Sequence, residues 1–192
     1  TRVVFQDHYS ITIMGSLKAL GQKNDSIYFT SIDTTGFLKW KKEIGGWNGL
    51  IFQDVNDTVI LDYCHFSFGK ATNAQYLAYG GALRIYNANC VIISNSTFYH
   101  NLTTSKGGAL YAENSNINIF NCEVDSNFGF NEEGVYMHGA GFQFNNCKVK
   151  MENMYFHDNY CANCYGGGVN FDSCYVYVNN AVFEDNYAVN AA

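Results

Sequence analysis

One pattern of glycines and asparagines occurs four times in the second half of this 192-residue chain. Each copy opens on a short glycine-rich cluster and closes on a Phe-x-x-Asn element or a near variant of it. The closing asparagines lie 26, 32 and 27 residues apart, and the spacing varies mostly between an asparagine and the next glycines. Such a repeat is typical of a solenoid, in which each copy forms one coil and insertions form loops on one edge. The copies are residues 80–101, 107–127, 139–159 and 166–186.

Apolar and polar residues alternate inside each copy, which predicts β-strands rather than helices. Equivalent residues of the four copies form columns that point inward and stack, ~4.8 Å from coil to coil if the strands pair in parallel. The main core column is Phe98, Val124, Phe156 and Phe183. A second inward column is Ser96, Cys122, Met154 and Ala181. With three short strands and three corners in each coil, the pattern predicts an all-β, single-stranded parallel β-helix.

Two further columns contain only asparagine. The alternation changes phase at the first column, which indicates a bend, and asparagine tolerates the left-handed backbone of a bend better than other non-glycine residues. Stacked amides can also hydrogen-bond to one another along the axis. The sequence therefore predicts two structural ladders: Asn95, Asn121, Asn153 and Asn180 at the bend, and Asn101, Asn127, Asn159 and Asn186 at the end of the repeat.

The whole chain, residues 1–192, is expected to form one β-helix domain. Regular repeats cover residues 80–186, and residues 1–79 form looser N-terminal coils in which the apolar alternation is less regular. A segment from about residue 34 to 46 is rich in lysine, threonine and glycine, and it is expected to leave the coil as a loop.

Charged residues make up only 15% of the chain, below the usual ~25%, and the net charge is −6 with two arginines. Because no basic stripe is present to follow a phosphate backbone, we expect no nucleic-acid partner. No apolar run reaches the ~20 residues of a membrane span. The chain starts at Thr1 without a signal peptide, which is typical of a processed secreted protein or a fragment. An extracellular or cell-surface location is therefore expected.

The Gly-Gly-Ala-Leu clusters at 80–83 and 107–110, paired with Phe-x-x-Asn, resemble the GGA(I/L/V) and FxxN repeats of the chlamydial polymorphic membrane proteins. They also resemble the repeats of bacterial secreted, adhesin-like β-helix proteins, and the resemblance covers about residues 6–186. It implies a right-handed, three-sheet, pectate-lyase-like β-helix outside the cell or on its surface. Val124 in place of phenylalanine and Ala140 in place of glycine depart from the pattern.

Enzymes of this fold class need charged side chains that converge on one point. Arg84, the candidate base of a lyase, has an outward strand position, with no carboxylates in its column. Outward acids are present at Asp125, Asp158, Glu184 and Asp185. The main interpretation is a solvated acidic edge, and weak calcium binding is the alternative. We therefore expect no catalytic site, no cofactor and no enzyme activity.

Cys161 and Cys164 form a Cys-x-x-Cys motif four residues after His157, and these three residues are weak candidates for a zinc site. Other loop residues or His138 in the preceding loop would have to supply the fourth ligand. A short disulfide or two unpaired thiols are the alternatives, because a lone Cys-x-x-Cys motif is weak evidence for a metal.

The other cysteines follow the columns. Cys147 and Cys174 hold equivalent positions one coil apart and form a second candidate disulfide. Cys64 and Cys122 lie on the inward column, where they are expected to act as small apolar fillers. With seven cysteines, at least one stays unpaired within the chain.

Glycosylation sequons begin at Asn24, Asn56, Asn95 and Asn101. Asn95 and Asn101 belong to the predicted ladders, and an amide that is buried in a ladder cannot carry a glycan. Asn24 and Asn56 lie near predicted turns and are the candidate glycosylation sites.

These observations favour a non-enzymatic structural or adhesive protein that binds a surface glycan, another protein or itself. Its outward face is rich in Tyr, Asn, Ser and Thr. Neither end carries a charged cap, so a missing flanking segment or end-to-end assembly into a cell-surface filament is expected. The alternative is a lyase, a glycosidase or a purely binding protein that holds a polysaccharide along a groove beside the loop at residues 128–139.

Overall fold

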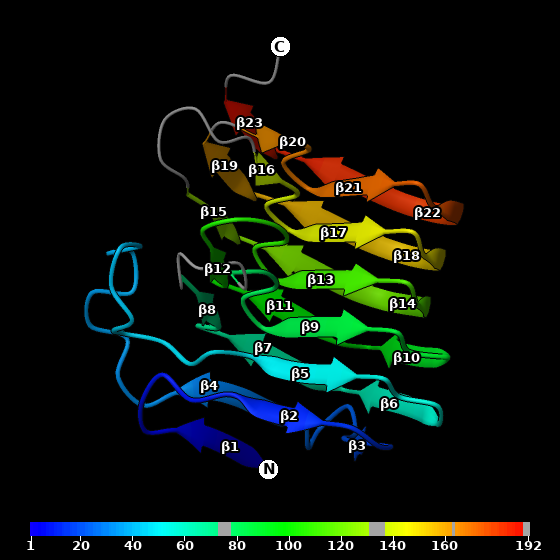
Figure 1. The fold of residues 1–192 in the computed structure, drawn as a ribbon, viewed down its shortest axis with the longest axis horizontal. Coiled ribbons are helices and arrows are strands. Elements are labelled where there is room, and N and C mark those ends of the chain that lie inside the picture. The colour runs from blue at the N-terminus through cyan, green and yellow to red at the C-terminus, as the bar shows by residue number, and fades with distance from the viewer. Residues whose placement is uncertain (73–77, 131–136, 163, 190–192) are drawn as a thin grey trace.

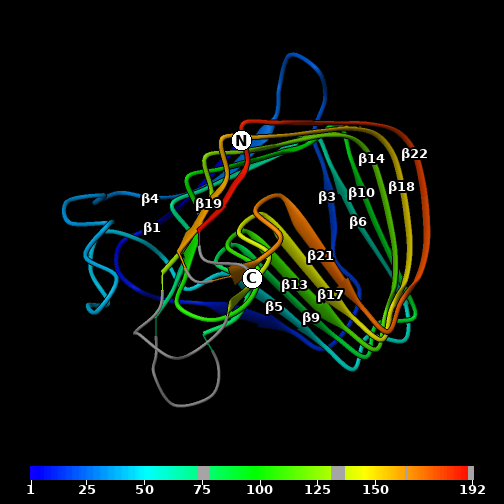
Figure 2. The same cartoon turned by 90° about the horizontal axis from the view of Figure 1, so that it is seen from above.

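The computed structural model describes residues 1–72, 78–130, 137–162 and 164–189. In these ranges the chain is all β, and its strands stack in parallel from coil to coil around one axis (Figures 1 and 2). The segment between β4 (Ile27–Ser31) and β5 (Leu50–Gln53) leaves the coil, and the chain returns to the stack at β5 (Figure 1). Three sheets that extend along this axis form the sides of the solenoid.

A ten-stranded sheet forms two of the sides, because its later strands bend at a corner. In early coils the two sides have separate strands, and in β14, β18 and β22 one strand of ten residues continues through the bend. Its strands are β1 (Arg2–Phe5), β3 (Lys18–Leu20), β4 (Ile27–Ser31), β6 (Thr58–Asp62), β7 (Cys64–Ser67), β10 (Cys90–Ser94), β11 (Thr97–Tyr99), β14 (Asn116–Asp125), β18 (Lys148–His157) and β22 (Tyr175–Glu184).

The remaining strands of the described residues form a six-stranded, a five-stranded and a two-stranded sheet. The six-stranded sheet contains β2 (Ile11–Ile13), β5 (Leu50–Gln53), β9 (Leu83–Tyr86), β13 (Leu110–Glu113), β17 (Phe142–Asn145) and β21 (Val169–Asp172). The five-stranded sheet contains β8 (Lys70–Ala71), β12 (Leu102–Thr103), β15 (Phe128–Gly129), β19 (Tyr160–Ala162) and β23 (Tyr187–Val189). The short sheet pairs β16 (Met137–His138) with β20 (Cys164–Tyr165).

The core follows the predicted phenylalanine column. Phe66 and Phe98 stack with ring centroids 5.0 Å apart, and Phe156 and Phe183 stack at 4.9 Å. Val124 interrupts the column, and Phe142 from the six-stranded sheet fills the space beside it. The Phe142 ring meets Phe98 and Phe156 edge-on, with centroids 4.9 and 5.4 Å away. A neighbouring sheet therefore compensates for the smaller side chain.

The first asparagine ladder forms at the bend of the ten-stranded sheet. Asn121 donates from Nδ2 to Asn95 Oδ1 at 3.1 Å, and Asn153 donates to Asn121 Oδ1 at 2.8 Å. Asn95 in turn donates to the carboxylate of Asp62 at 2.8 Å, so an acid terminates the ladder. All four ladder asparagines have a left-handed backbone with φ near +50°, as the change of phase in the sequence predicts.

The second ladder is buried and runs in the opposite direction. Asn101 donates from Nδ2 to Asn127 Oδ1, and Asn127 donates to Asn159 Oδ1, both at 2.9 Å. The left-handed residue at this corner is the one before each asparagine, for example Ser126 with φ 51°. The ladder amides are therefore free to turn inward, where Asn101, Asn127 and Asn159 are fully buried.

A third ladder, which the sequence did not predict, lies at the corner between the six-stranded and ten-stranded sheets. Asn146 donates to Asn114 Oδ1 at 2.7 Å, and Asn114 donates to Asn87 Oδ1 at 3.3 Å. Asn87 donates to the carboxylate of Asp54 at 2.7 Å. This ladder repeats the arrangement of the first, with left-handed residues at every step and an acid at its end.

Candidate functional site

Two neighbouring columns of outward side chains run along one side of the solenoid. In each coil, this side is formed by the residues that come directly after the bend of the ten-stranded sheet. Strand pairing places Tyr28, His65, Thr97, Glu123 and Tyr155 in one column, and Ser67, Tyr99, Asp125, His157 and Glu184 in the other. We call these ten residues the outer strip. They point outward because the left-handed asparagine resets the alternation, so that the phenylalanine between each pair points inward.

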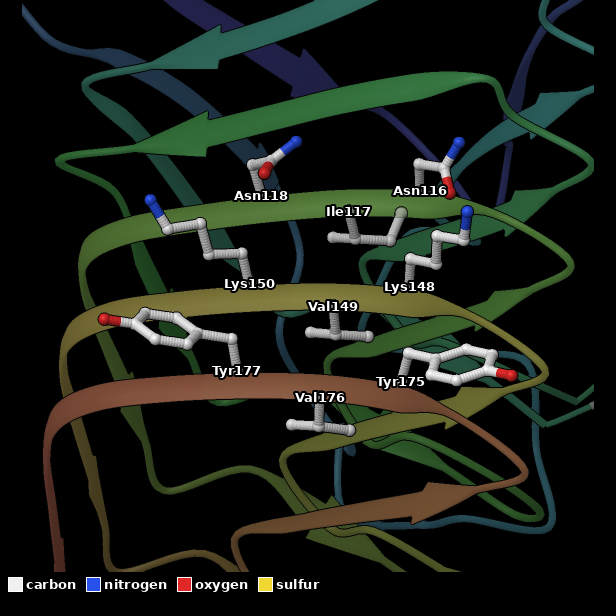
Figure 3. A pocket seen from close by; sticks show the side chains of 9 residues that line it. All are labelled: Asn116, Ile117, Asn118, Lys148, Val149, Lys150, Tyr175, Val176 and Tyr177. Atoms are coloured by element: carbon white, nitrogen blue, oxygen red, sulfur yellow. The ribbon is translucent and has the colours of Figure 1, made fainter.

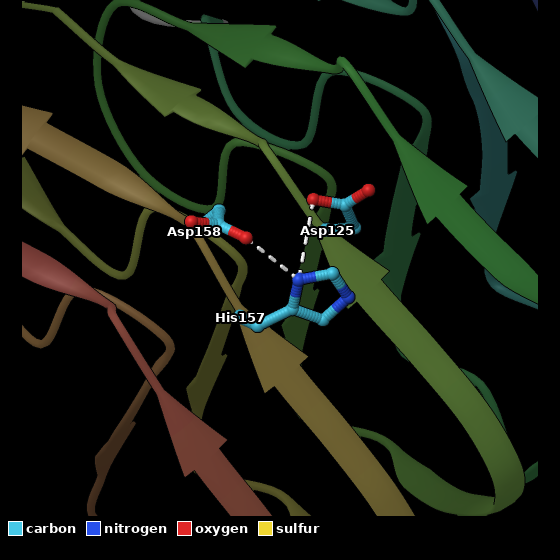
Figure 4. A group of neighbouring side chains, drawn as sticks. All are labelled: Asp125, His157 and Asp158. Atoms are coloured by element: carbon cyan, nitrogen blue, oxygen red, sulfur yellow. Dashed lines mark hydrogen bonds and ion pairs between the residues drawn. The ribbon is translucent and has the colours of Figure 1, made fainter.

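His157 lies at the centre of a carboxylate cluster on the outer strip (Figure 4). Its Nε2 lies 3.0 Å from Glu123 Oε1, and its Nδ1 lies 2.8 Å from Asp158 Oδ2 and 3.5 Å from Asp125 Oδ1. Partial burial opposes the imidazolium charge, but hydrogen bonds to Asp158 and Glu123 outweigh it and raise the pKa of His157. In the protonated form both ring N–H groups donate to carboxylates.

Tyr155 packs beside this cluster. Its ring stacks on the imidazole of His157 with centroids 4.2 Å apart, and its hydroxyl donates to Glu184 Oε2 at 2.6 Å. The hydrogen bond to Glu184 raises the pKa of the phenol to about 12. Tyr155 therefore presents an uncharged aromatic ring whose orientation is fixed by its contacts with His157 and Glu184.

The N-terminal half of the strip is aromatic. Tyr28 stacks on His65 with ring centroids 4.6 Å apart, and His65 Nδ1 contacts Thr97 Oγ1 at 2.5 Å. Burial lowers the pKa of His65. Tyr28 and Tyr99 are each 43% exposed, which leaves their rings accessible to a ligand.

Two shallow cavities adjoin the outer strip, one on each side. A cavity of about 270 Å³ includes Tyr28, His65, Tyr99 and Asp125 in its lining. A cavity of about 540 Å³ includes Lys23, Tyr63, Asn121 and Tyr155 in its lining. Thr97 and Glu123 line both cavities, so Glu123 stands between the two spaces.

A third groove, of about 450 Å³, lies on the side before the bend (Figure 3). Lysines and tyrosines of successive coils border it, with Lys148 beside Tyr175 and Lys150 beside Tyr177. The ammonium of Lys150 lies 5.7 Å from the Tyr177 ring centroid and pairs with Glu152 at 3.2 Å. This surface differs from the outer strip because it is basic and aromatic, without a cluster of acids.

Arg84 points away from the core between the inward Leu83 and Ile85, as the sequence predicts, but it is covered rather than exposed. It is 4% exposed, and its Nη2 donates to the carbonyl of Asn48 at 2.8 Å and to the side-chain oxygen of the same residue. In the next coil Tyr111 is also buried, packed against the rings of Tyr79 and Tyr86. Alternation places these side chains outside the core, but neighbouring segments cover them.

The structure does not assemble the weak zinc site proposed for His157, Cys161 and Cys164. Cys161 and Cys164 are joined in a disulfide, and they are buried together with Ala140 away from the main core. His157 points instead toward the carboxylates of the outer strip. His138 contacts Asn170, with Nδ1 3.4 Å from the Asn170 amide nitrogen.

Cys147 and Cys174, the second candidate disulfide, are free thiols. The N–H of Cys147 donates to Cys174 Sγ at 3.3 Å, and Cys147 Sγ donates to the carbonyl of Asn145 at 3.2 Å. Cys64 and Cys122 are buried on the inward column, and burial raises the pKa of both thiols to about 12. Each of these four thiols donates a hydrogen bond to a backbone carbonyl.

The remaining residues that the sequence singled out differ in how exposed they are. Asn24 and Asn56 are exposed, whereas Asn101 is fully buried and Asn95 lies within its ladder. Asp185 is exposed at a left-handed corner. The proposed groove beside residues 128–139 falls largely on residues 131–136, which lie outside the described residues.

The aromatic and carboxylate pattern of the outer strip, including Glu123, Tyr155 and Tyr99, was not among the predicted features. Its sequence signal is the fixed offset from the bend asparagines: Glu123 and Tyr155 stand two residues after one, and Tyr99 stands four residues after one.

Comparison with known proteins supports the fold. The family model described as the right-handed β-helix region matches residues 23–192. No curated protein and no solved structure gave a match. The predicted right-handed parallel β-helix is thereby confirmed, while the finer resemblance to chlamydial and adhesin-like proteins stays a prediction. Across the described ranges, no helix is long and apolar enough to cross a bilayer.

Proposed function

Because the chain belongs to the right-handed β-helix family, we propose that it is a non-enzymatic, adhesive protein that binds a polysaccharide along the outer strip. The observation that carries this proposal is the spacing of outward-facing tyrosines, of which Tyr28 and Tyr99 are exposed and Tyr155 is half-buried. Tyr28, Tyr99 and Tyr155 recur on every second coil, so their rings are about 10 Å apart along the axis at ~4.8 Å per coil.

This spacing suits an extended polysaccharide laid parallel to the solenoid axis. In a β-1,4-linked chain, alternate sugars present the same face, so one tyrosine can stack against every second sugar. Tyrosine offers a flat apolar face together with a hydroxyl that hydrogen-bonds, which is the combination that sugar rings require. The cavities beside Thr97 and Glu123 provide room for the substituents of the sugars between the rings.

Two features favour binding without cleavage. A glycosidase needs one carboxyl that protonates the leaving oxygen and a second that acts as nucleophile or base. Here Glu184 accepts a hydrogen bond from Tyr155, while Glu123 and Asp158 pair with His157, so each of these acids already has a partner within the protein. A lyase needs a cationic base beside its acids. The ten residues of the outer strip include neither lysine nor arginine, and a lysine, Lys23, is present only in the lining of the adjoining larger cavity.

The proposal is tested by affinity electrophoresis in gels that contain soluble polysaccharides. We expect Tyr99→Ala to weaken binding about tenfold, a loss of about 1.4 kcal/mol. Tyr175→Ala is the matched control, because Tyr175 is an exposed tyrosine on the side before the bend. Equal weakening by both variants would contradict the outer strip as the binding surface. Release of new reducing ends during incubation would instead favour the enzymatic alternative.

We include an extracellular or cell-surface location in this proposal, because such a polysaccharide is found outside the cell. End-to-end assembly into a filament stays a separate prediction. Light scattering and electron microscopy of the purified protein distinguish a fibre from a monomer.

A further inference from the structure

The outer strip and its surroundings carry more acidic than basic side chains. Glu123, Asp125 and Glu184 belong to it, and Asp158 adjoins it, whereas the basic side chains are His65 and His157 in the strip and Lys23 in the lining of the larger cavity. The Glu123 and Asp158 side chains are 45% and 60% exposed, so their outer oxygens face solvent even while they pair with His157. A ligand that lies on this surface meets a net negative field.

The carboxylates and the aromatic rings alternate along the axis. Tyr99 on β11 is followed one coil later by Glu123 and Asp125 on β14, then by Tyr155 on β18, and then by Glu184 on β22. A polymer that stacks alternate sugars on the tyrosines therefore presents the intervening sugars to carboxylates. Glu123 is the best placed of these, because it lines both cavities.

We propose that the ligand is a polysaccharide with protonated amino groups, namely a β-1,4-linked polymer of amino sugars without N-acetyl groups. This inference rests on the proposed function and names the ligand class of the same site. Ammonium groups on the intervening sugars donate charge-assisted hydrogen bonds to Glu123 and Asp125, which are stronger than hydrogen bonds between neutral groups. A polyuronate carries carboxylates of its own and is repelled by the same surface.

Isothermal titration at a mildly acidic pH, where the amines are protonated, tests the proposal with three oligosaccharides of equal length. The probes are glucosamine oligomers, N-acetylglucosamine oligomers and oligogalacturonate. We expect the glucosamine oligomers to bind at least about tenfold more tightly than the acetylated ones. Binding should weaken as salt rises toward 1 M, where the Debye length falls to about 3 Å. Oligogalacturonate should not bind.

Two variants localise the effect. Glu123→Gln should remove most of the preference for the deacetylated oligomer, and Glu152→Gln is the matched control, since Glu152 pairs with Lys150 on the other side of the bend. Equal binding of acetylated and deacetylated oligomers would overturn the inference and leave polysaccharide binding standing. Tighter binding of oligogalacturonate would overturn it as well. Failure of all three probes to bind would remove support from both the inference and the proposed function.

Discussion

Replacing Asn127 by alanine tests how much the buried ladder stabilises the fold. Asn127 is fully buried and donates from Nδ2 to the Phe98 carbonyl at 3.0 Å and to Asn159 Oδ1 at 2.9 Å. Its Oδ1 accepts from the backbone N–H of Asn101 at 3.0 Å and from the Asn101 side chain at 2.9 Å. Alanine removes all four hydrogen bonds at once and provides no replacement donor or acceptor.

The expected cost follows from the groups that lose a partner. A buried polar group without a hydrogen bond costs about 1–3 kcal/mol. The N–H of Asn101 and the carbonyl of Phe98 both lose the Asn127 side chain, so we expect the free energy of unfolding to fall by about 3–4 kcal/mol. For a protein of this size, that corresponds to roughly 10 °C in melting temperature.

Urea denaturation followed by circular dichroism and by tryptophan fluorescence measures the change, provided that the two transitions coincide. Asn121→Gly is the matched control. It removes one amide from the exposed ladder, where water replaces the lost bonds, and glycine adopts the left-handed backbone at φ 53° without strain. We expect it to cost less than about 1 kcal/mol. If the two variants lower the free energy of unfolding equally, the argument from burial is wrong.

Three further outcomes are expected. Gly108→Ala should abolish cooperative folding in circular dichroism melts, because its Cβ would lie 1.9 Å from the Ala140 carbonyl oxygen. Phe98→Ala should lower the free energy of unfolding by about 3–5 kcal/mol in urea titrations, since it opens the stacked core. The stabilisation from His157 is present below the ordinary pKa of 6.5 and is lost as pH rises through the raised pKa, so melting temperatures should fall over that range. His157→Gln should remove this fall, and an unchanged pH profile in the variant would contradict the assigned ion pairs.

The inward part of the fold was predictable because the core has one chemical requirement. Every coil must place an apolar residue at the same point, so Phe98, Phe156 and Phe183 appear in the sequence at equal positions. The bend asparagines were predictable for the same reason, since a left-handed corner favours one residue type in each coil.

The third ladder and the covering of Arg84 were not predictable in this way. Asn87, Asn114 and Asn146 also recur at one position of the repeat, but the fourth copy has Ser173 there, so this column is less regular than the bend column. The burial of Arg84 depends on Asn48, which lies 36 residues earlier at the end of an irregular segment. No period of the repeat relates these two residues.

The outward columns of this β-helix tolerate substitutions that its inward columns do not. A change at an inward position disturbs the stack, because the coils above and below contact it. A change at Tyr99 or Glu123 leaves the ladders and the core unaltered, so the chemistry of the surface can vary coil by coil while the spacing stays fixed. A solenoid is therefore suited to recognise a polymer, since one coil adds one contact at a constant step. The alternation of rings and carboxylates on the outer strip has the regularity that such recognition requires.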